Sequence, residues 1–174
     1  MNHPLVVALQ AQGWQVLAIS EQEKVQLRSD LSTQPDQDLT SSLQALCRDY
    51  AYLRSLDECC WFLTDWEKSG LSDSTFAADE FKKQSLDAAI NPQQETEILA
   101  FWAQHQVILM SVYADYAFVA YVLSGADQGK IVMGMEPEYE DVDIIFDSFE
   151  HFTQALIAHV NGAEHAVFTR LFSK

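Results

Sequence analysis

Residues 98–152 contain the pattern that decides the fold, and they read ILAFWAQHQVILMSVYADYAFVAYVLSGADQGKIVMGMEPEYEDVDIIFDSFEHF. Two short runs, 107–113 and 116–123, are rich in Val, Ile, Tyr and Phe, and only Ala114 and Asp115 separate them. This is the pattern of two strands joined by a tight hairpin.

Two further strands follow after a turn at 124–129. Residues 130–135 and 142–146 are apolar and bounded by turn residues, and Gly134 indicates a bulge in the first of them. Because short turns leave no room for a crossover, we expect neighbouring antiparallel strands at 107–113, 116–123 and 130–135.

An acidic segment, 136–141, joins the last two strands. Pro137 excludes a central strand there, so we expect an exposed connection. Asp147 and Ser148 then offer side-chain acceptors for a helix start, and apolar residues at helical spacing predict a helix over 149–160.

The N-terminal region is less clearly patterned. Residues 5–19 are either a short helix leading into a strand or a helix end followed by GWQVLAI as a strand, and the pattern does not decide between them. A capping box of Ser20 and Glu23 predicts a helix over 21–31. Residues 32–38, STQPDQD, resemble a linker that is too short to separate two domains.

The middle of the chain is mainly helical in pattern. We expect a helix over 39–57 and a core strand or helix end over 60–63. We also expect a helix over 95–104, begun after Asn91-Pro92, whose Trp102 is a buried anchor. The apolar stripe of the first helix comprises Leu43, Leu46, Cys47, Tyr50 and Leu53. The predicted fold class is α+β, with N-terminal helices, a mainly antiparallel sheet and a C-terminal helix packed on the sheet.

The composition fits a single domain over residues 1–174. The chain is 48% hydrophobic and 11% aromatic, which supplies a core without disulfide or metal. It has no apolar run of membrane-spanning length, and its first residues lack the basic region of a signal peptide, so we expect a soluble, cytoplasmic protein without membrane contact.

Residues that usually carry chemistry are sparse. Cys47, Cys59 and Cys60 match neither a disulfide framework nor metal spacing, and we expect buried reduced thiols. The five histidines are scattered, and the glycines form no phosphate-binding loop, so the sequence predicts no metal, no cofactor and no catalytic residue.

The charge balance is more informative. There are 26 acidic and 10 basic residues, a formal net charge of -16, and no Lys or Arg occurs between Lys130 and Arg170. Such a field repels nucleic acid and anionic membranes and attracts basic partners. The alternative is that the charge serves solubility alone.

The acidic segment is the candidate partner-binding site. In an extended conformation Glu136, Glu138 and Glu140 would project from one face. Tyr139 among them offers rigid contact area and a hydroxyl, or else packs back on the sheet. Catalysis would need a carboxylate in an apolar pocket, and a row of solvated acids is the opposite environment. The predicted partner-binding residues are Glu136, Glu138, Tyr139, Glu140, Asp141 and Asp143.

The order of these motifs resembles a known family. FWAQHQVILMSV, DYAFVAYVL and GKIVMGMEPEYEDVDIIFDSFEHF, preceded by FLTDWEKSGLSDSTFAADEFKKQSLDAA, resemble the SMI1/KNR4 proteins, whose superfamily is also called SUKH. The resemblance is strongest over 60–160. The chain departs from the family wording at Ala78 and Asp115 and lacks its N-terminal signature.

The resemblance implies a non-catalytic interaction protein. In bacterial members this is commonly an immunity protein that neutralises a cognate polymorphic toxin, often a nuclease, and an acidic surface suits a partner with a basic face. A second hypothesis is a regulatory or scaffolding protein with a basic host partner, and a third is a hydrolase that uses carboxylates of residues 136–143. The oligomeric state stays open.

Overall fold

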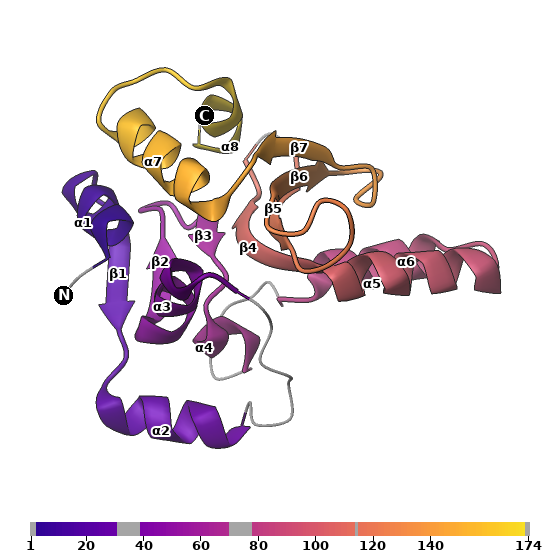
Figure 1. Ribbon diagram of the computed structural model, residues 1–174, viewed down its shortest axis with the longest axis horizontal. Coiled ribbons are helices and arrows are strands. Elements are labelled where there is room, and N and C mark those ends of the chain that lie inside the picture. Colours follow the sequence, from indigo (N-terminus) through magenta and orange to yellow (C-terminus); the bar gives the residue numbers. More distant parts are fainter. Residues whose placement is uncertain (1–2, 31–38, 70–77, 114, 173–174) are drawn as a thin grey trace.

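The computed structural model describes residues 3–30, 39–69, 78–113 and 115–172, and the architecture is α+β (Figure 1). These residues form eight helices and one seven-stranded sheet. The C-terminal helix over Phe149–Val160 packs against the sheet, as the sequence predicts, and a further helix, Ala166–Phe172, follows it.

The seven strands lie in the sheet in the order in which they occur in the chain, and every neighbouring pair is antiparallel. The predicted neighbours over 107–113, 116–123 and 130–135 are confirmed. The strands are β1 (Gln15–Ala18), β2 (Tyr50–Arg54), β3 (Cys60–Phe62), β4 (His105–Ser111), β5 (Ala117–Val122), β6 (Ile131–Met135) and β7 (Asp143–Phe146).

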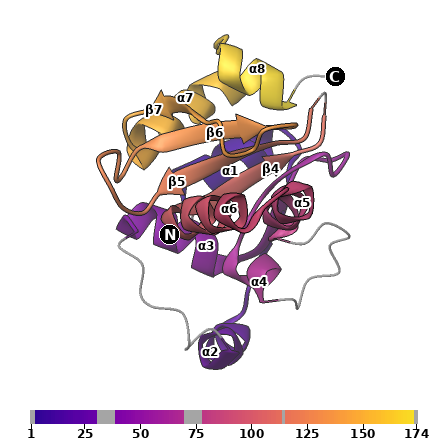
Figure 2. The same ribbon diagram turned by 90° about the vertical axis from the view of Figure 1, so that its right-hand side faces the viewer.

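Helices cover both faces of this sheet (Figure 2). One face carries α1 (Pro4–Ala11), α3 (Ser41–Asp49), α7 (Phe149–Val160) and α8 (Ala166–Phe172). The other carries α5 (Glu80–Ala88) and α6 (Pro92–Gln104), an adjacent pair that extends away from the sheet (Figure 1). The remaining helices, α2 (Glu21–Asp30) and α4 (Asp65–Lys68), contribute Leu27 and Trp66 to a small cluster beside β2.

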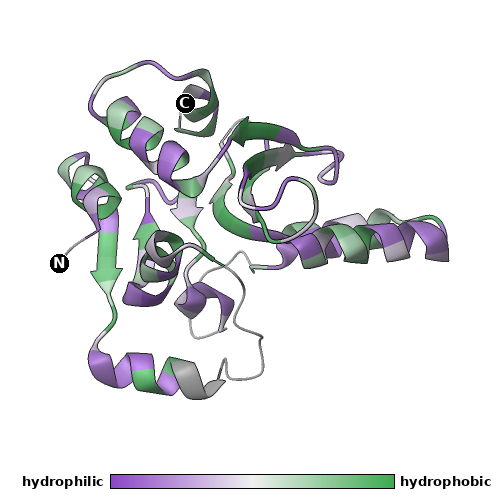
Figure 3. Ribbon diagram, viewed as in Figure 1, coloured by the Kyte–Doolittle hydropathy of each residue, from purple (hydrophilic) through white to green (hydrophobic). Residues whose placement is uncertain are grey.

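Burial follows from this double cover. Every residue of β5 is buried, with Val119 and Tyr121 on the α7 side and Phe118 and Ala120 on the α6 side. Side chains alternate between the faces of a strand, so a strand covered on both faces is apolar throughout. The hydropathy colouring shows the contrast between the apolar central strands and the largely hydrophilic α2 (Figure 3).

Three predicted helix starts are confirmed by their caps. The Glu23 amide donates to Ser20 Oγ (3.3 Å) and the Ser20 amide donates to Glu23 Oε2 (2.7 Å), which is a reciprocal capping box. Asn91 Oδ1 accepts from the amide of Gln94 (2.9 Å) at the start of α6. Ser148 caps α7 in the same way.

Other expectations need correction. Residues 39–57 are not one helix, because α3 ends at Asp49 and residues 50–54 form β2, which pairs with β1 and β3. At the N-terminus the first alternative holds, a short helix leading into a strand, and Cys60–Phe62 is a strand. The predicted linker over 32–38 lies outside the described residues.

Gly134 does not form a bulge, because its pairing with Phe118 is in regular register. Glycine is required there by packing. A Cβ atom would lie 2.6 Å from the Phe118 ring and 2.7 Å from the carbonyl oxygen of Tyr139. The acidic connection therefore folds back closely over β6.

Within the described part of the chain, the helices are too short or too polar to cross a lipid bilayer.

Candidate functional site

Three turns gather at one end of the sheet. The start of β3 pairs with the end of β4 (Cys60 with Ser111), and the start of β5 pairs with the end of β6 (Ala117 with Met135). In an antiparallel sheet with sequential strands, alternate turns fall on the same side. The turns after β2, β4 and β6 therefore share one end, which we call the turn end.

Backbone hydrogen bonds join these turns to one another. The amide of Val112 donates to the carbonyl of Cys59 (2.8 Å), which links the β4–β5 turn to the β2–β3 turn. The amide of Glu136 donates to the carbonyl of Tyr116 (2.9 Å), which links the β6–β7 connection to the β4–β5 turn. The three turns form one continuous strip of backbone.

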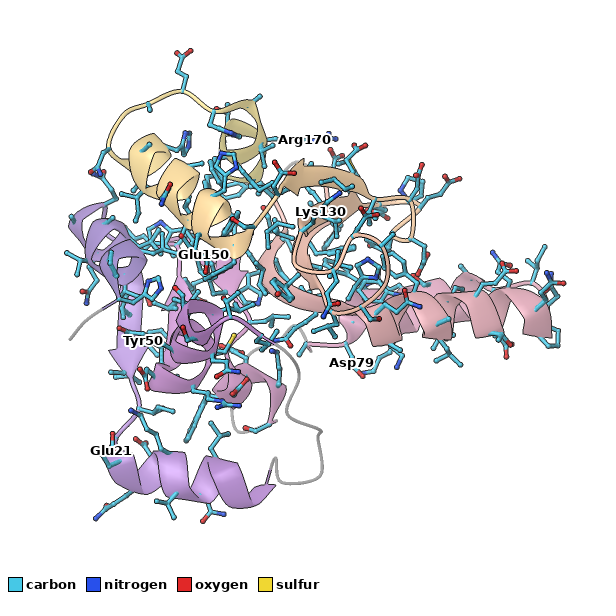
Figure 4. All side chains as sticks on the ribbon, viewed as in Figure 1. Glu21, Tyr50, Asp79, Lys130, Glu150 and Arg170 are labelled. Carbon is cyan, nitrogen blue, oxygen red and sulfur yellow. The ribbon has the colours of Figure 1, made fainter. Side chains whose placement is uncertain are left out.

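This strip is acidic. Arg54 pairs with Glu58 (3.3 Å). Arg170, which projects from α8 (Figure 4), pairs with Asp115 (3.2 Å). For the remaining carboxylates, no ion pair forms with any residue that the structure describes. The acidic residues of the turn end are Asp57, Glu58, Asp115, Glu136, Glu138, Glu140, Asp141 and Asp143.

Helix α5, next to the connection, brings some positive charge near the turn end. Helix α5, whose Gln84 contacts the connection, carries Lys82 and Lys83, and Lys83 is paired with Asp79 (2.8 Å). The sequence around the connection contains no Lys or Arg after Lys130, but helix α5 brings two lysines close to it in space.

Four of the six predicted partner-binding residues are exposed at the turn end: Glu136, Glu138, Asp141 and Asp143. Their side chains are exposed to solvent and do not lie in an apolar pocket. They suit long-range attraction of a basic surface better than proton transfer, which needs a carboxylate in an apolar site.

Tyr139, the fifth member, packs back on the sheet. It is 3% exposed, and its ring stacks on Phe81 with 4.7 Å between the centroids. Its hydroxyl donates to Gln84 Oε1 (2.9 Å). Burial, assisted by neighbouring acids such as Glu136, raises the pKa of Tyr139 to about 12. Tyr139 anchors the connection and is not an exposed contact residue.

Glu140 also turns inward. The indole Nε1 of Trp102 donates to Glu140 Oε1 (2.7 Å), and both residues are half-buried. The connection is a series of turns, so Glu136, Glu138 and Glu140 do not project from one face as an extended segment would. Trp102 packs against Phe118, but it is less buried than the sequence predicts.

Asp57 and Tyr113 belong to the turn end but were not predicted from the sequence. The Tyr113 hydroxyl donates to Asp57 Oδ2, and this hydrogen bond is the main reason that the pKa of Asp57 lies below its usual range. The two residues are 56 positions apart in the chain, and no local motif connects them.

Among the described residues, no three His, Cys, Asp or Glu side chains group in a way that could hold a metal ion. All three cysteines are free; Cys47 and Cys60 are buried, and Cys59 is half-buried. Burial raises the pKa of the Cys60 thiol well above its usual value, which disfavours the reactive thiolate.

Comparisons with protein-family models, curated proteins and solved structures find no match to this chain.

Proposed function

We propose that this chain is a non-catalytic protein-binding module of the SMI1/KNR4 (SUKH) type, which binds a protein partner through the acidic turn end. Within that class we propose an immunity protein that neutralises a cognate polymorphic toxin of the nuclease type. The resemblance of residues 60–160 to the family supplies the biological role, and the turn end supplies the surface.

The observation that carries this proposal is the assembly of the three turns. Exposed carboxylates from the β6–β7 connection and from the β2–β3 turn lie on one hydrogen-bonded strip, and only Glu58 and Asp115 among the described acids there are paired with arginine. Such an arrangement attracts a basic face and raises the rate of encounter.

A nuclease is the favoured partner because its substrate site is built from cations. Lys and Arg side chains neutralise phosphates, and an array of protein carboxylates can occupy the same positions. The same surface would also serve a regulatory protein with a basic host partner. For the hydrolase hypothesis, the geometry offers less support: Glu136, Glu138, Asp141 and Asp143 are exposed, and Glu140 is held by Trp102.

The test uses two triple variants with the same change in net charge. The first is Glu136→Lys, Glu138→Lys and Asp141→Lys at the turn end. The matched control is Asp87→Lys, Glu95→Lys and Glu97→Lys, three exposed acids on α5 and α6. Wild type and both variants serve as baits for affinity capture from the source organism, with quantitative mass spectrometry of the captured proteins.

We expect a basic protein that the wild type and the control retain and the turn-end variant loses. If this protein is a nuclease and the wild type inhibits it, the immunity role is supported; a non-nuclease partner favours the regulatory hypothesis. A partner that the turn-end variant binds as well as the wild type would contradict the proposed binding surface.

A further inference from the structure

A pocket opens at the turn end, beside the β2–β3 turn. It has a volume of ≈ 380 Å³, within the range of small ligand sites. Its apolar walls are Trp14, Leu56 and Phe172, and its polar lining includes Ser55, Asp57 and Tyr113. The pocket thus combines an apolar surface with one carboxylate.

The apolar walls are fixed by the core beneath them. The Trp14 ring contacts Phe62 (5.9 Å between centroids) and meets Phe172 edge to face (5.7 Å). Leu56, by contrast, is 74% exposed at the tip of the turn. Leu56 therefore exposes apolar surface to water beside an aromatic wall, and a ligand in the pocket would cover this surface.

Asp57 is held in place by three donors. Its Oδ1 accepts from the Ser55 hydroxyl (2.8 Å) and from the amide of Cys59 (3.3 Å), and its Oδ2 accepts from the Tyr113 hydroxyl. A carboxylate oxygen has two lone pairs, so Oδ2 keeps one acceptor position. Since these donors favour the ionised form, the pKa of Asp57 is lowered.

The arginine closest in the sequence, Arg54, does not pair with this carboxylate. Arg54 donates from Nε to Gln15 Oε1 (3.1 Å), pairs with Glu58 (3.3 Å), and lies over the Tyr52 ring. Among the residues that the structure places, no Lys, Arg or His forms an ion pair with Asp57. The pocket therefore holds a fixed negative charge without a cation.

We propose that this pocket receives an arginine or lysine side chain of the protein partner, with its aliphatic stem against Trp14, Leu56 and Phe172 and its cationic group at Asp57 Oδ2. Arginine and lysine side chains have both an aliphatic stem and a cationic end, so they match the apolar walls and the carboxylate of the pocket. The inference rests on the proposed function. It adds a specific anchor to the acidic surface, because the pocket shares the turn end with the connection.

The experiment needs no partner. Uniformly ¹⁵N-labelled protein is titrated with N-acetyl-L-arginine N-methylamide, and the shift of the Trp14 indole N–H is followed by NMR. The neutral isostere, N-acetyl-L-citrulline N-methylamide, is the ligand control. A hydrogen bond to a charged group contributes about 1.5 kcal/mol or more, so the citrulline probe should bind about tenfold more weakly.

Two variants localise the binding. Asp57→Asn should weaken the arginine probe about tenfold, whereas Asp127→Asn, the same substitution at the opposite end of the sheet, should not change its affinity. Leu56→Ser alters an exposed residue and should weaken the probe without endangering the fold, so the proposal remains testable if Asp57→Asn is unstable.

The absence of a saturable shift would overturn the proposal, as would equal binding of the citrulline probe. A third probe, n-butylguanidine, separates the sources of the cation: if it binds at least tenfold more tightly than the arginine probe, the pocket is a site for a free amine or guanidine. If the arginine probe binds but the capture experiment finds no basic partner, the result counts against the proposed function and not against the pocket.

Discussion

At position 134 the sheet accepts no side chain, because a Cβ atom would overlap the Phe118 ring and the carbonyl of Tyr139. We expect Gly134→Ala to lower the free energy of unfolding by about 1–3 kcal/mol, the usual cost of overpacking. Urea denaturation measures the change. In a Phe118→Leu background the same substitution should cost less, and an equal cost in both backgrounds would show that the Phe118 contact is not the cause.

The Tyr113–Asp57 hydrogen bond predicts a pH effect. The folded-state pKa of Asp57 is lowered, chiefly by Tyr113, so its stabilising contribution is present above the unfolded pKa of about 3.9 and is lost as pH falls through the folded pKa. We expect Tyr113→Phe to raise the pKa of Asp57, measured from the pH dependence of its ¹³Cγ shift. An unchanged pKa would mean that the other donors dominate.

Side-chain direction within the connection could not be predicted from the sequence. The letters of 136–140 alternate acids with other residues, and this pattern fits an extended, solvated segment. Tyr139 and Glu140 turn inward because Phe81, Gln84 and Trp102, from α5 and α6, offer a stacking surface, an acceptor and a donor. These partners are at least 38 positions away in the chain.

At the scale of elements, the cap of α7 connects sequence to stability directly. Ser148 Oγ accepts from the amide of His151 (3.1 Å) at a helix that buries Phe149, Phe152 and Leu156. Ser148→Ala should lower the free energy of unfolding by about 1 kcal/mol, because a first-turn amide loses its acceptor. Ser148→Asp keeps an acceptor and should cost less, and thermal unfolding of both variants tests the expectation.

The strands and helices that could be predicted are those with strong local signals. The capped helices α2, α6 and α7 and the strands β4 to β7 follow from caps, turn residues and apolar runs. Strand β2 was missed because Tyr50 and Leu53 continue the helical spacing of α3. Pairing with β1 and β3 decides its conformation, and such partners cannot be read from local spacing.

For the whole molecule, the net charge of -16 predicts a dependence on salt. Raising the ionic strength from about 0.01 M to about 0.15 M shortens the screening length from about 30 Å to about 8 Å. Weaker repulsion among the exposed acids should raise Tm. Neutralising the turn end (Glu136→Gln, Glu138→Gln, Asp141→Asn) should reduce this rise, and an equal rise would assign the effect to charges elsewhere.

The site as a whole depends on the strand order. The acidic segment is visible in the sequence, but its neighbours in space are the turns after β2 and β4, and Asp57 joins the surface only because β3, β4, β5 and β6 pair in succession. The short turns predict that β4, β5 and β6 are neighbours, but the sequence does not show that β3 pairs with β4. The pocket at Asp57 could not have been predicted for the same reason.

The sequential strand order also has a consequence during synthesis. As the chain leaves the ribosome, each strand finds its partner already made, so the sheet can grow from β1 to β7 without waiting for distant segments. The helices on one face of the sheet cannot assemble in the same order, because α1, near the N-terminus, packs against α7, near the C-terminus. The apolar surface of α1, α3 and the strands thus stays uncovered until residues 149–172 have been translated, and a chaperone that binds nascent chains could bind this surface until then.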